Sequence, residues 1–449
     1  MKHHYRFAPI VLALSIVSSS GCWGQAPPSS SLPSNAVVPP PPASLSVDQA
    51  VADALVDNPQ IRAAVRRLSL AQMKTATARS LDDPMLMVRD WQTPLRKPWD
   101  LNQAQLMFSL QQTFPGKLKL DLRAKISDDD AQAASDDLET LRQDVSASVR
   151  EACSALLRNA DEMRVHNQQA TVLNQAISAT LAEYTAGKAP QSDVLRAQMA
   201  LTRLNEHLIE LEAERDAARA ELSVLLGHSP DAPIEIAGAY RVPAALPSTE
   251  ELERIAIEHR PELASLRKQI TRSEDQSQLA RLALKPDLTL AAGYMLMPTG
   301  SSFRNAYMAE LTMPLPLLNR GRHDGEAKQA DAATDVARAD LDARTSAVFL
   351  EIRQAQIALH SAQSRIKLYR DTLLPQAEAN FSASASAYEN NRGEFTNLID
   401  SQNLLLDIRT AYYQALAAAD ASGAQLERSI GMPIPASPTT DSTPERTTK

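Results

Sequence analysis

The chain carries an internal duplication. Residues 184–227 match residues 388–431 at a constant offset of 204 residues, with a tyrosine at the start and a glycine at the end of each segment. Three upstream pairs keep nearly the same offset, 202 or 205 residues: Asn58-Pro59 with Arg260-Pro261, Pro84 with Pro286, and Gly116-Lys117 with Gly321-Arg322. Self-similarity at one period indicates two copies of one structural unit. We therefore predict repeat 1 over residues 45–227 and repeat 2 over residues 248–431, joined by a linker over 228–247.

Long helices are predicted in both repeats. From Leu138 to Met163, apolar residues recur in steps of 3-4-4-3-4-4-3, an eleven-residue repeat that keeps an apolar stripe on a nearly straight helix. Residues 197–225 follow a heptad pattern instead, which requires a partner helix. Residues 122–184 contain no proline and can form one helix of about 90 Å at 1.5 Å per residue. A rod of this length suits a stalk or tunnel rather than a compact core.

Each repeat also contains a segment with a different period. Polar and apolar residues alternate in Gln105–Gln111 and in Leu288–Tyr294, which predicts β-hairpins at about 84–114 and 286–314. One chain then supplies four strands, whereas the smallest membrane barrels have about eight. Because an open sheet edge leaves amides without hydrogen-bond partners in lipid, such a barrel must be shared among chains.

The N-terminus has the pattern of an export signal. Basic residues precede an apolar run from Phe7 to Val17, and Ser-Gly-Cys follows at residue 22, so residues 1–22 are predicted to be a lipoprotein-type signal peptide. Cys22 then carries an N-terminal lipid; the alternative is ordinary cleavage without lipidation. The Pro/Ser-rich residues 23–44 are predicted to be an extended linker, and the polar residues 432–449 a disordered tail.

Composition excludes several classes of function. The net charge of −8 disfavours a nucleic-acid surface, and no apolar run of 18 residues occurs after the signal segment. The eight histidines are scattered, and no metalloprotease motif, phosphate-binding glycine loop or nucleophile elbow is present. We therefore predict that the protein is not an enzyme and needs no cofactor beyond a lipid on Cys22.

The duplicated order of helix, hairpin and helices resembles that of TolC-type outer-membrane efflux proteins. The resemblance covers about residues 45–431 and is carried by these motifs: Tyr184-x-x-Gly187, Asp193-Val194-Leu195, Leu225-Leu226-Gly227 and Phe114-Pro115-Gly116-Lys117. It implies a mainly α fold with long coiled-coil helices, and a homotrimer that forms a 12-stranded β-barrel and a periplasmic α-helical tunnel. It also implies an adaptor, an inner-membrane pump and a Gram-negative outer-membrane location. Two further segments resemble the heavy-metal branch, the CusC and CzcC type: Asp83-Pro84-Met85 and Pro314–Gly321.

The same resemblance points to the turns between the long helices. These turns, at residues 184–195 and 388–400, would form the periplasmic entrance and bind the adaptor, with Asp400 in an acidic gate at which a second family aspartate is replaced by Asn397. The alternative for Asp400 is a solvated acid near a helix N-terminus. The candidate residues for contacts between helices and for adaptor docking are Tyr184, Gly187, Asp193, Tyr388, Arg392 and Gly393.

Methionines gather in the predicted hairpins. Met85 and Met87 share one strand face, as do Met295 and Met297, and thioethers are ligands for Cu(I) and Ag(I). The alternative, which the sequence favours, is that methionine is a flexible apolar filler on a barrel wall.

Two other functions fit an exported helical protein. A periplasmic adaptor, or membrane-fusion protein, would have one helical hairpin between glycine-rich β domains, whereas this chain has two hairpins and only 13 glycines. A coiled-coil scaffold of the envelope would not need the period-two segments. The predicted function is therefore the outer-membrane channel of a tripartite system that exports small molecules or metal ions.

Overall fold

The computed structural model describes residues 44–91, 105–243, 246–297, 305–390, 392–434 and 437–438. In repeat 1 the elements are β1 (Leu45–Ser46), α1 (Val47–Asp57), α2 (Pro59–Ala78), β2 (Met85–Trp91), β3 (Gln105–Phe114), α3 (Lys117–Thr185) and α4 (Gln191–Leu225). Two short strands follow, β4 (Ile236–Ala237) and β5 (Arg241–Val242). In repeat 2 they are α5 (Thr249–His259), α6 (Pro261–Arg281), η1 (Leu282–Leu284), β6 (Leu288–Leu296), β7 (Asn305–Thr312), η2 (Pro316–Asn319), α7 (Arg320–Leu368), η3 (Tyr369–Leu373), α8 (Leu374–Glu389) and α9 (Phe395–Ile430). The short strand β8 (Ser437–Pro438) follows repeat 2.

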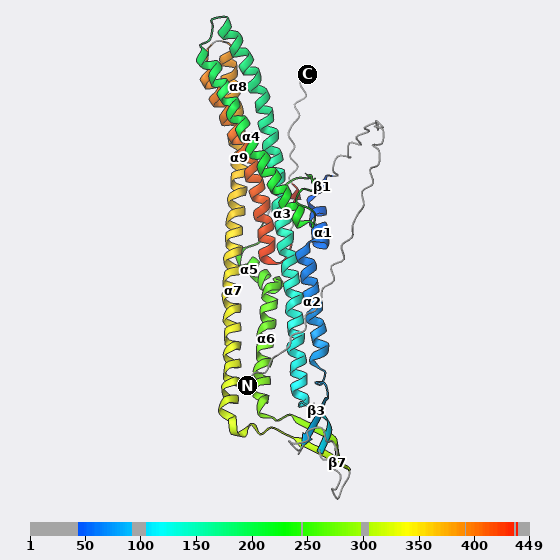
Figure 1. Ribbon diagram of the computed structural model, residues 1–449. Coiled ribbons are helices and arrows are strands. Elements are labelled where there is room, and N and C mark those ends of the chain that lie inside the picture. The colour runs from blue at the N-terminus through cyan, green and yellow to red at the C-terminus, as the bar shows by residue number, and fades with distance from the viewer. Residues whose placement is uncertain are drawn as a thin grey trace, which may run out of the picture. The chain divides into compact units, whose positions relative to one another are not determined.

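The predicted order of helices and hairpins is therefore present in both repeats (Figure 1). The predicted signal peptide, Cys22 and the linker up to residue 43 lie outside the described residues. Within the described ranges, no helix combines the length and apolar character that a membrane span requires.

Each repeat begins with two helices separated at an X-Pro step. α1 ends at Asp57 and α5 at His259, because the residue before a proline disfavours the α conformation and the proline then occupies the first position of the next helix. Asn58 caps α2 by accepting hydrogen bonds from the Gln60 and Ile61 amides. The duplicated Asn58-Pro59 and Arg260-Pro261 pairs thus mark the same structural position.

The long helices match the predicted rods. α3 has 69 residues and is about 100 Å long at 1.5 Å per residue. Its counterpart runs through α7, η3 and α8 without a turn, although Pro375 lies near the start of α8. The π-helical segment η3 lies just before that proline, where the proline ring would clash with the carbonyl four residues earlier in a regular helix. The wider turn lets repeat 2 keep one continuous rod.

The four long strands form one sheet in the order β2-β3-β6-β7. β2 pairs with β3 and β6 with β7, as the hairpin prediction requires, and all neighbours are antiparallel. The β3–β6 pairing, which joins the two repeats over nine residue pairs, was not predicted. Figure 1 shows this sheet at the end of α3 opposite to the turn that leads into α4.

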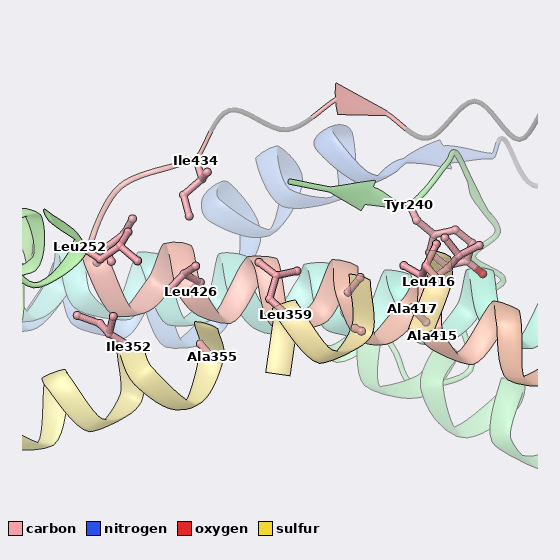
Figure 2. Close-up of a cluster of buried hydrophobic side chains, with 14 of the residues drawn as sticks. Tyr240, Leu252, Ile352, Ala355, Leu359, Ala415, Leu416, Ala417, Leu426 and Ile434 are labelled. Carbon is pink, nitrogen blue, oxygen red and sulfur yellow. The ribbon is translucent and has the colours of Figure 1, made fainter. Parts of the chain in front are cut away.

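The core repeats as well. In repeat 2, α5, α7 and α9 pack around a cluster that includes Leu252, Ile352, Leu359 and Leu426 (Figure 2). In repeat 1, α1, α3 and α4 bury a similar cluster. A polar bond anchors each one: the Asn58 side chain donates to the Leu225 carbonyl at 2.8 Å, and Arg260 donates to the Ser429 carbonyl at 3.1 Å.

The prediction of a disordered tail from residue 432 is wrong for its first residues. Ile434 is buried against the repeat 2 core (Figure 2), and the backbone of β8 pairs with β5. The physical reason is that one apolar side chain finds an open site over α9, which the polar composition of the segment does not reveal. The predicted linker over 228–247 also contains β4, which pairs in parallel with β1.

Candidate functional site

Two turns connect the long helices, one in each repeat. The first lies between Thr185 and Gln191 and the second between Glu389 and Phe395, within the ranges predicted from the sequence. Gly187 adopts a left-handed conformation with φ of 70°, which ends α3 and lets the chain reverse. Gly393 serves packing instead, because a Cβ there would lie 3.0 Å from the Cβ of Ala387.

Tyr388 connects the two turns. Its hydroxyl donates to Glu183 at 2.7 Å, and its ring meets Phe395 edge-on with 5.6 Å between centroids. Burial, together with the hydrogen bond to the Glu183 carboxylate, raises the pKa of Tyr388 to about 12, so the hydroxyl keeps its proton at neutral pH. The equivalent Tyr184 is 42 % exposed. Tyr184 cannot form the equivalent hydrogen bond, because the position in repeat 2 that corresponds to Glu183 is Ala387.

Replacing Tyr388 with phenylalanine removes this tie and should loosen the tip. A hydrogen bond to a charged group is worth about 1.5–3 kcal/mol, so we expect amide hydrogen exchange in residues 176–186 and 380–390 to accelerate by roughly tenfold or more. Mass spectrometry of the purified protein measures the exchange. Tyr184→Phe is the matched control, since no hydrogen bond from its hydroxyl is found among the described residues. Equal exchange in the two variants would contradict the assignment.

The other predicted tip residues make no comparable contact within the described residues. The Asp193 carboxylate accepts from its neighbour Ser192 at 3.3 Å, and Arg392 bonds through its backbone amide to the Ala387 carbonyl. Asn397 and Asp400 are exposed on the first turns of α9. The structure thus brings Tyr388 together with Glu183, which the sequence argument missed, and leaves Asp193 and Arg392 apart.

Asp400 borders a groove between α3, α4 and α9. The groove has a volume of about 850 Å³ and lies next to a small apolar cluster that includes Leu173, Leu204 and Phe395. α9 contributes the carboxylates of Asp400 and Asp407. The remaining charged and titratable residues that line the groove are Arg196, Arg203, His166 and His207. Carboxylates on α9 therefore share the groove with guanidinium groups on α4.

Two histidines meet in this groove. The rings of His166 and His207 are 4.9 Å apart, and Nδ1 of His166 lies 2.8 Å from the Glu162 carbonyl, which assigns the proton to Nδ1 because a carbonyl only accepts. Burial lowers the pKa of His166, so the ring is neutral at pH 7. The pair was not predicted, although both residues lie about 20 positions from Gly187 and an antiparallel hairpin brings such positions together. In the part of the chain that the structure describes, no three His, Cys, Asp or Glu side chains are placed to hold a metal ion.

The sheet at the other end of α3 has two chemically different faces. One face, which we call the apolar face, carries Leu86, Val88, Phe108, Leu110, Tyr294 and Tyr307, among others. Most of its large side chains are exposed, with Phe108 at 39 % and Tyr307 at 90 %. The opposite face is mostly covered and contains Ser109, Gln111, Thr113 and Thr289. Within the described ranges, the outer edges of β2 and β7 pair with no further strand. Exposed apolar surface on a sheet with such open edges indicates contact with another nonpolar phase or chain.

A family model described as outer membrane efflux protein matches residues 50–228 and 252–432, one match for each repeat. The chain belongs to this family. The predicted resemblance and the predicted channel function are therefore confirmed at the level of the family, whose members are transport proteins.

Individual relatives agree with this assignment. The cobalt-zinc-cadmium resistance protein CzcC of Cupriavidus metallidurans is 24 % identical over 433 residues, which cover 95 % of this chain and 99 % of that protein. Similar solved structures include the outer-membrane channel OprN, with a TM-score of 0.73 at 20 % identity over 86 % of this chain and 89 % of that one. VceC of Vibrio cholerae has a TM-score of 0.72 at 19 % identity (87 % and 97 % covered), and CusC has 0.73 at 14 % (87 % and 93 %). The fold of this efflux family member is thus that of outer-membrane channels.

Proposed function

We propose that the protein is the outer-membrane channel subunit of a tripartite efflux system and works as a homotrimer. The observation that supports this most directly is the four-stranded sheet, which draws two strands from each repeat and in which the outer edges of β2 and β7 have no partner strand among the described residues. Four strands cannot close on themselves, and lipid does not tolerate free edges. Three chains that join β7 of one to β2 of the next would close a 12-stranded barrel.

The two faces of the sheet fit this assembly. The strands have 7 to 10 residues, close to the 9–11 residues with which a tilted strand crosses a bilayer. The exposed apolar face would contact lipid, and the covered polar face would line the lumen. The long helices of three chains would continue the lumen as a tunnel into the periplasm, with the Tyr388 turn at its far end, where an adaptor and an inner-membrane pump would dock.

Asp400 is the residue we propose for an acidic ring at that end. Three copies of its exposed carboxylate would favour cations over anions in the tunnel. Each charge contributes about 0.4 kcal/mol at about 10 Å in water. At about 0.1 M salt, screening over one Debye length reduces the sum for the three charges to about 0.45 kcal/mol, with opposite sign for cations and anions. Asp400→Asn should therefore lower the cation-to-anion permeability ratio by roughly fivefold at that salt concentration. Reversal potentials in planar bilayers measure the ratio.

Asn397, close to Asp400 on α9, offers a matched control for this prediction. Asn397→Asp adds a carboxylate one helical turn away and should raise the ratio, because it gives the ring its second set of charges. If neither substitution changes the reversal potential, the two residues are solvated surface groups and not part of a gate.

We propose transition-metal cations as the cargo. CzcC, which carries cobalt, zinc and cadmium resistance in its name, matches nearly the whole chain, and CusC shares its fold. Deletion of the gene should then sensitise cells to one or more of Co(II), Zn(II), Cd(II), Cu(I) and Ag(I), while sensitivity to organic antibiotics stays unchanged. The opposite pattern would identify a drug channel.

The assembly has its own test. Outer-membrane fractions should contain a complex of three chains that migrates as a trimer in unheated gels and as a 48.9 kDa monomer, less its signal peptide, after heating. A soluble monomer would refute the channel assignment. Mass spectrometry of the mature N-terminus would decide whether Cys22 is acylated.

A further inference from the structure

All methionines in the described strands lie on one face of the sheet. Opposite residues in an antiparallel ladder project to the same side, and residues two apart along a strand do so as well. Met107 pairs with Met295, and in the adjacent row Met87 pairs with Ser109, which pairs with Gly293, which pairs with Met308. We call this side of the sheet, which is covered over most of its area, the methionine face; its methionines are Met85, Met87, Met107, Met295 and Met308. Met85, at the end of β2, is 57 % exposed, whereas the other four are buried or half-buried.

This placement counts against methionine as an apolar filler of the exposed apolar wall. A filler belongs among the leucines, valines and aromatic residues of the exposed apolar face, and that face holds no methionine within the described strands. The five methionines instead share a face with serine, threonine and glutamine. Met107 is only 4 % exposed, whereas its neighbours Leu106 and Phe108 point to the other side. Register thus separates the sulfur atoms from the lipid-compatible surface.

Four of these methionines surround two small residues. Met107 and Met295 are direct partners, which places their Cβ atoms about 4.5–5.5 Å apart. Met87 and Met308 lie in the next row, on either side of Ser109 and Gly293. Nothing larger than glycine fits at position 293, because a Cβ there would lie 2.8 Å from the Phe108 carbonyl oxygen. Met87 is the diagonal neighbour of Met107 and Met308 that of Met295, at about 7–8 Å, which long side chains can bridge, so each flanking thioether can approach the one beside it.

The sulfur atoms already face polar groups. The Gln105 amide donates to the sulfur of Met295 at 2.6 Å, and the Arg89 guanidinium donates to the sulfur of Met87 at 3.3 Å. On this face Glu310 is the nearest carboxylate by register, opposite Ala291, so the side chains there carry charges of both signs. The thioether sulfur atoms themselves are neutral. Any preference of this face for one cation over another must therefore come from the softness of sulfur rather than from charge.

We propose that the methionine face binds a soft monovalent cation, Cu(I) or Ag(I), through the thioethers of Met107 and Met295, with Met87 and Met308 as further ligands. Thioether sulfur prefers the soft monovalent cations Cu(I) and Ag(I) to harder ions such as Zn(II), Co(II) or K⁺. Neutral ligands hold such an ion weakly enough to release it, which a conduit requires. The site rests on the proposed function only in that the methionine face lines the lumen; binding itself needs no efflux partner.

The direct test is silver binding to the purified, detergent-solubilised full chain. All proteins carry Cys153→Ala, because a thiol would also bind silver, and Cys22 is replaced by alanine as well unless mass spectrometry shows that it is acylated. The buffer contains nitrate in place of chloride. The parent should bind Ag(I) saturably, with a silver X-ray absorption spectrum showing sulfur neighbours. The double variant Met107→Leu/Met295→Leu should lose at least tenfold in affinity, since leucine keeps the volume but not the sulfur.

Controls separate the site from general effects. Met199→Leu/Met432→Leu removes two methionines outside the sheet and should bind silver like the parent. The Met107/Met295 variant is informative only if it forms the same oligomer as the parent. Otherwise the double variant Met87→Leu/Met308→Leu, at the edge of the cluster, is used instead, and it should also lower the affinity for silver. Absent saturable binding by the parent, or equal affinity in both sheet variants and the parent, overturns the site.

Cell assays keep this inference apart from the proposed function. If gene deletion sensitises cells to no metal, the proposed cargo fails whatever the silver titration shows. If deletion sensitises cells to metals but the sheet variants bind silver like the parent, only the methionine site fails. If both hold, the Met107/Met295 variant should lose tolerance to Cu and Ag and keep tolerance to Zn and Co.

Discussion

Gly431→Ala is expected to lower the free energy of unfolding by about 2–4 kcal/mol. Gly431 ends α9 with φ of 80°, a left-handed conformation that costs about 1–2 kcal/mol for a residue with a Cβ. The added Cβ would also lie 2.8 Å from the His259 carbonyl oxygen and 3.0 Å from the Arg260 Cα. Those are backbone atoms at the X-Pro step between α5 and α6, so they cannot move aside without shifting a helix.

Substitutions at two other glycines separate the cost of the left-handed backbone from the cost of the steric clash. Gly187→Ala should cost only the left-handed conformation, because its φ is 70° but no heavy atom lies within 4 Å of the added Cβ. Gly227→Ala should cost as much as Gly431→Ala, because in repeat 1 its Cβ would meet the Asp57 carbonyl oxygen at 2.5 Å. Denaturant titration followed by circular dichroism gives the three values. Equal losses at 431 and 187 would show that the close approach between helices is unimportant.

Arg260→Met is expected to cost about 3–5 kcal/mol, the typical penalty for removing one partner of a buried ion pair. Arg260 is 4 % exposed and forms ion pairs with Glu262 at 3.0 Å and Glu351 at 2.8 Å, while it also donates to the Ser429 carbonyl. Arg344 binds the same two glutamates. Without Arg260, one guanidinium faces two partly buried carboxylates, and a backbone carbonyl loses its donor.

The loss should shrink in acid. Burial raises the pKa of Glu262, but the hydrogen bond from Arg344 and the charges of Arg260 and Arg344 outweigh it and hold the pKa below its ordinary value of 4.5. A lowered pKa contributes stability above the unfolded-state value and loses it as the pH falls through the folded-state value. The wild type should therefore lose stability below about pH 4.5 more steeply than Arg260→Met, in which the carboxylate protonates readily.

Arg254→Met is the matched control for the ion-pair prediction. Arg254 also pairs with two glutamates, Glu251 and Glu258, but all three side chains are solvent-exposed on one helix. Water and salt screen such pairs, so this substitution should change stability little at any pH. Similar losses for Arg254→Met and Arg260→Met would contradict the argument that burial makes the Arg260 network costly to break.

Local pattern predicted much of this fold because its signals are repeated and strong. The absence of proline between residues 122 and 184 correctly predicts one helix, and Gly187 correctly marks its end. The X-Pro steps at 58–59 and 260–261 correctly separate α1 from α2 and α5 from α6. These features depend on steric limits within a few residues, so they can be predicted from the local sequence alone.

Contacts between distant elements were harder to predict. Tyr388 was named as a contact between helices, but its partner Glu183 depends on how α8 lies beside α3. The meeting of His166 and His207 depends on hairpin register, and the buried Ile434 on a site that α9 leaves open. A short composition signal cannot reveal such pairs, because each needs the relative position of two elements.

By itself, the sequence determined the duplication, the long helices, the hairpins and the family, since each follows from periodicity and from the chain's own repeats. Only the tertiary structure decided that β3 pairs with β6 and in which register. That pairing assigns Met107 and Met295 to one face with Met87 and Met308, whereas a shift by one residue would turn the strand over. The face that a strand side chain occupies relative to another strand depends on their pairing, and one of the two partners of β3, strand β6, comes from the other repeat.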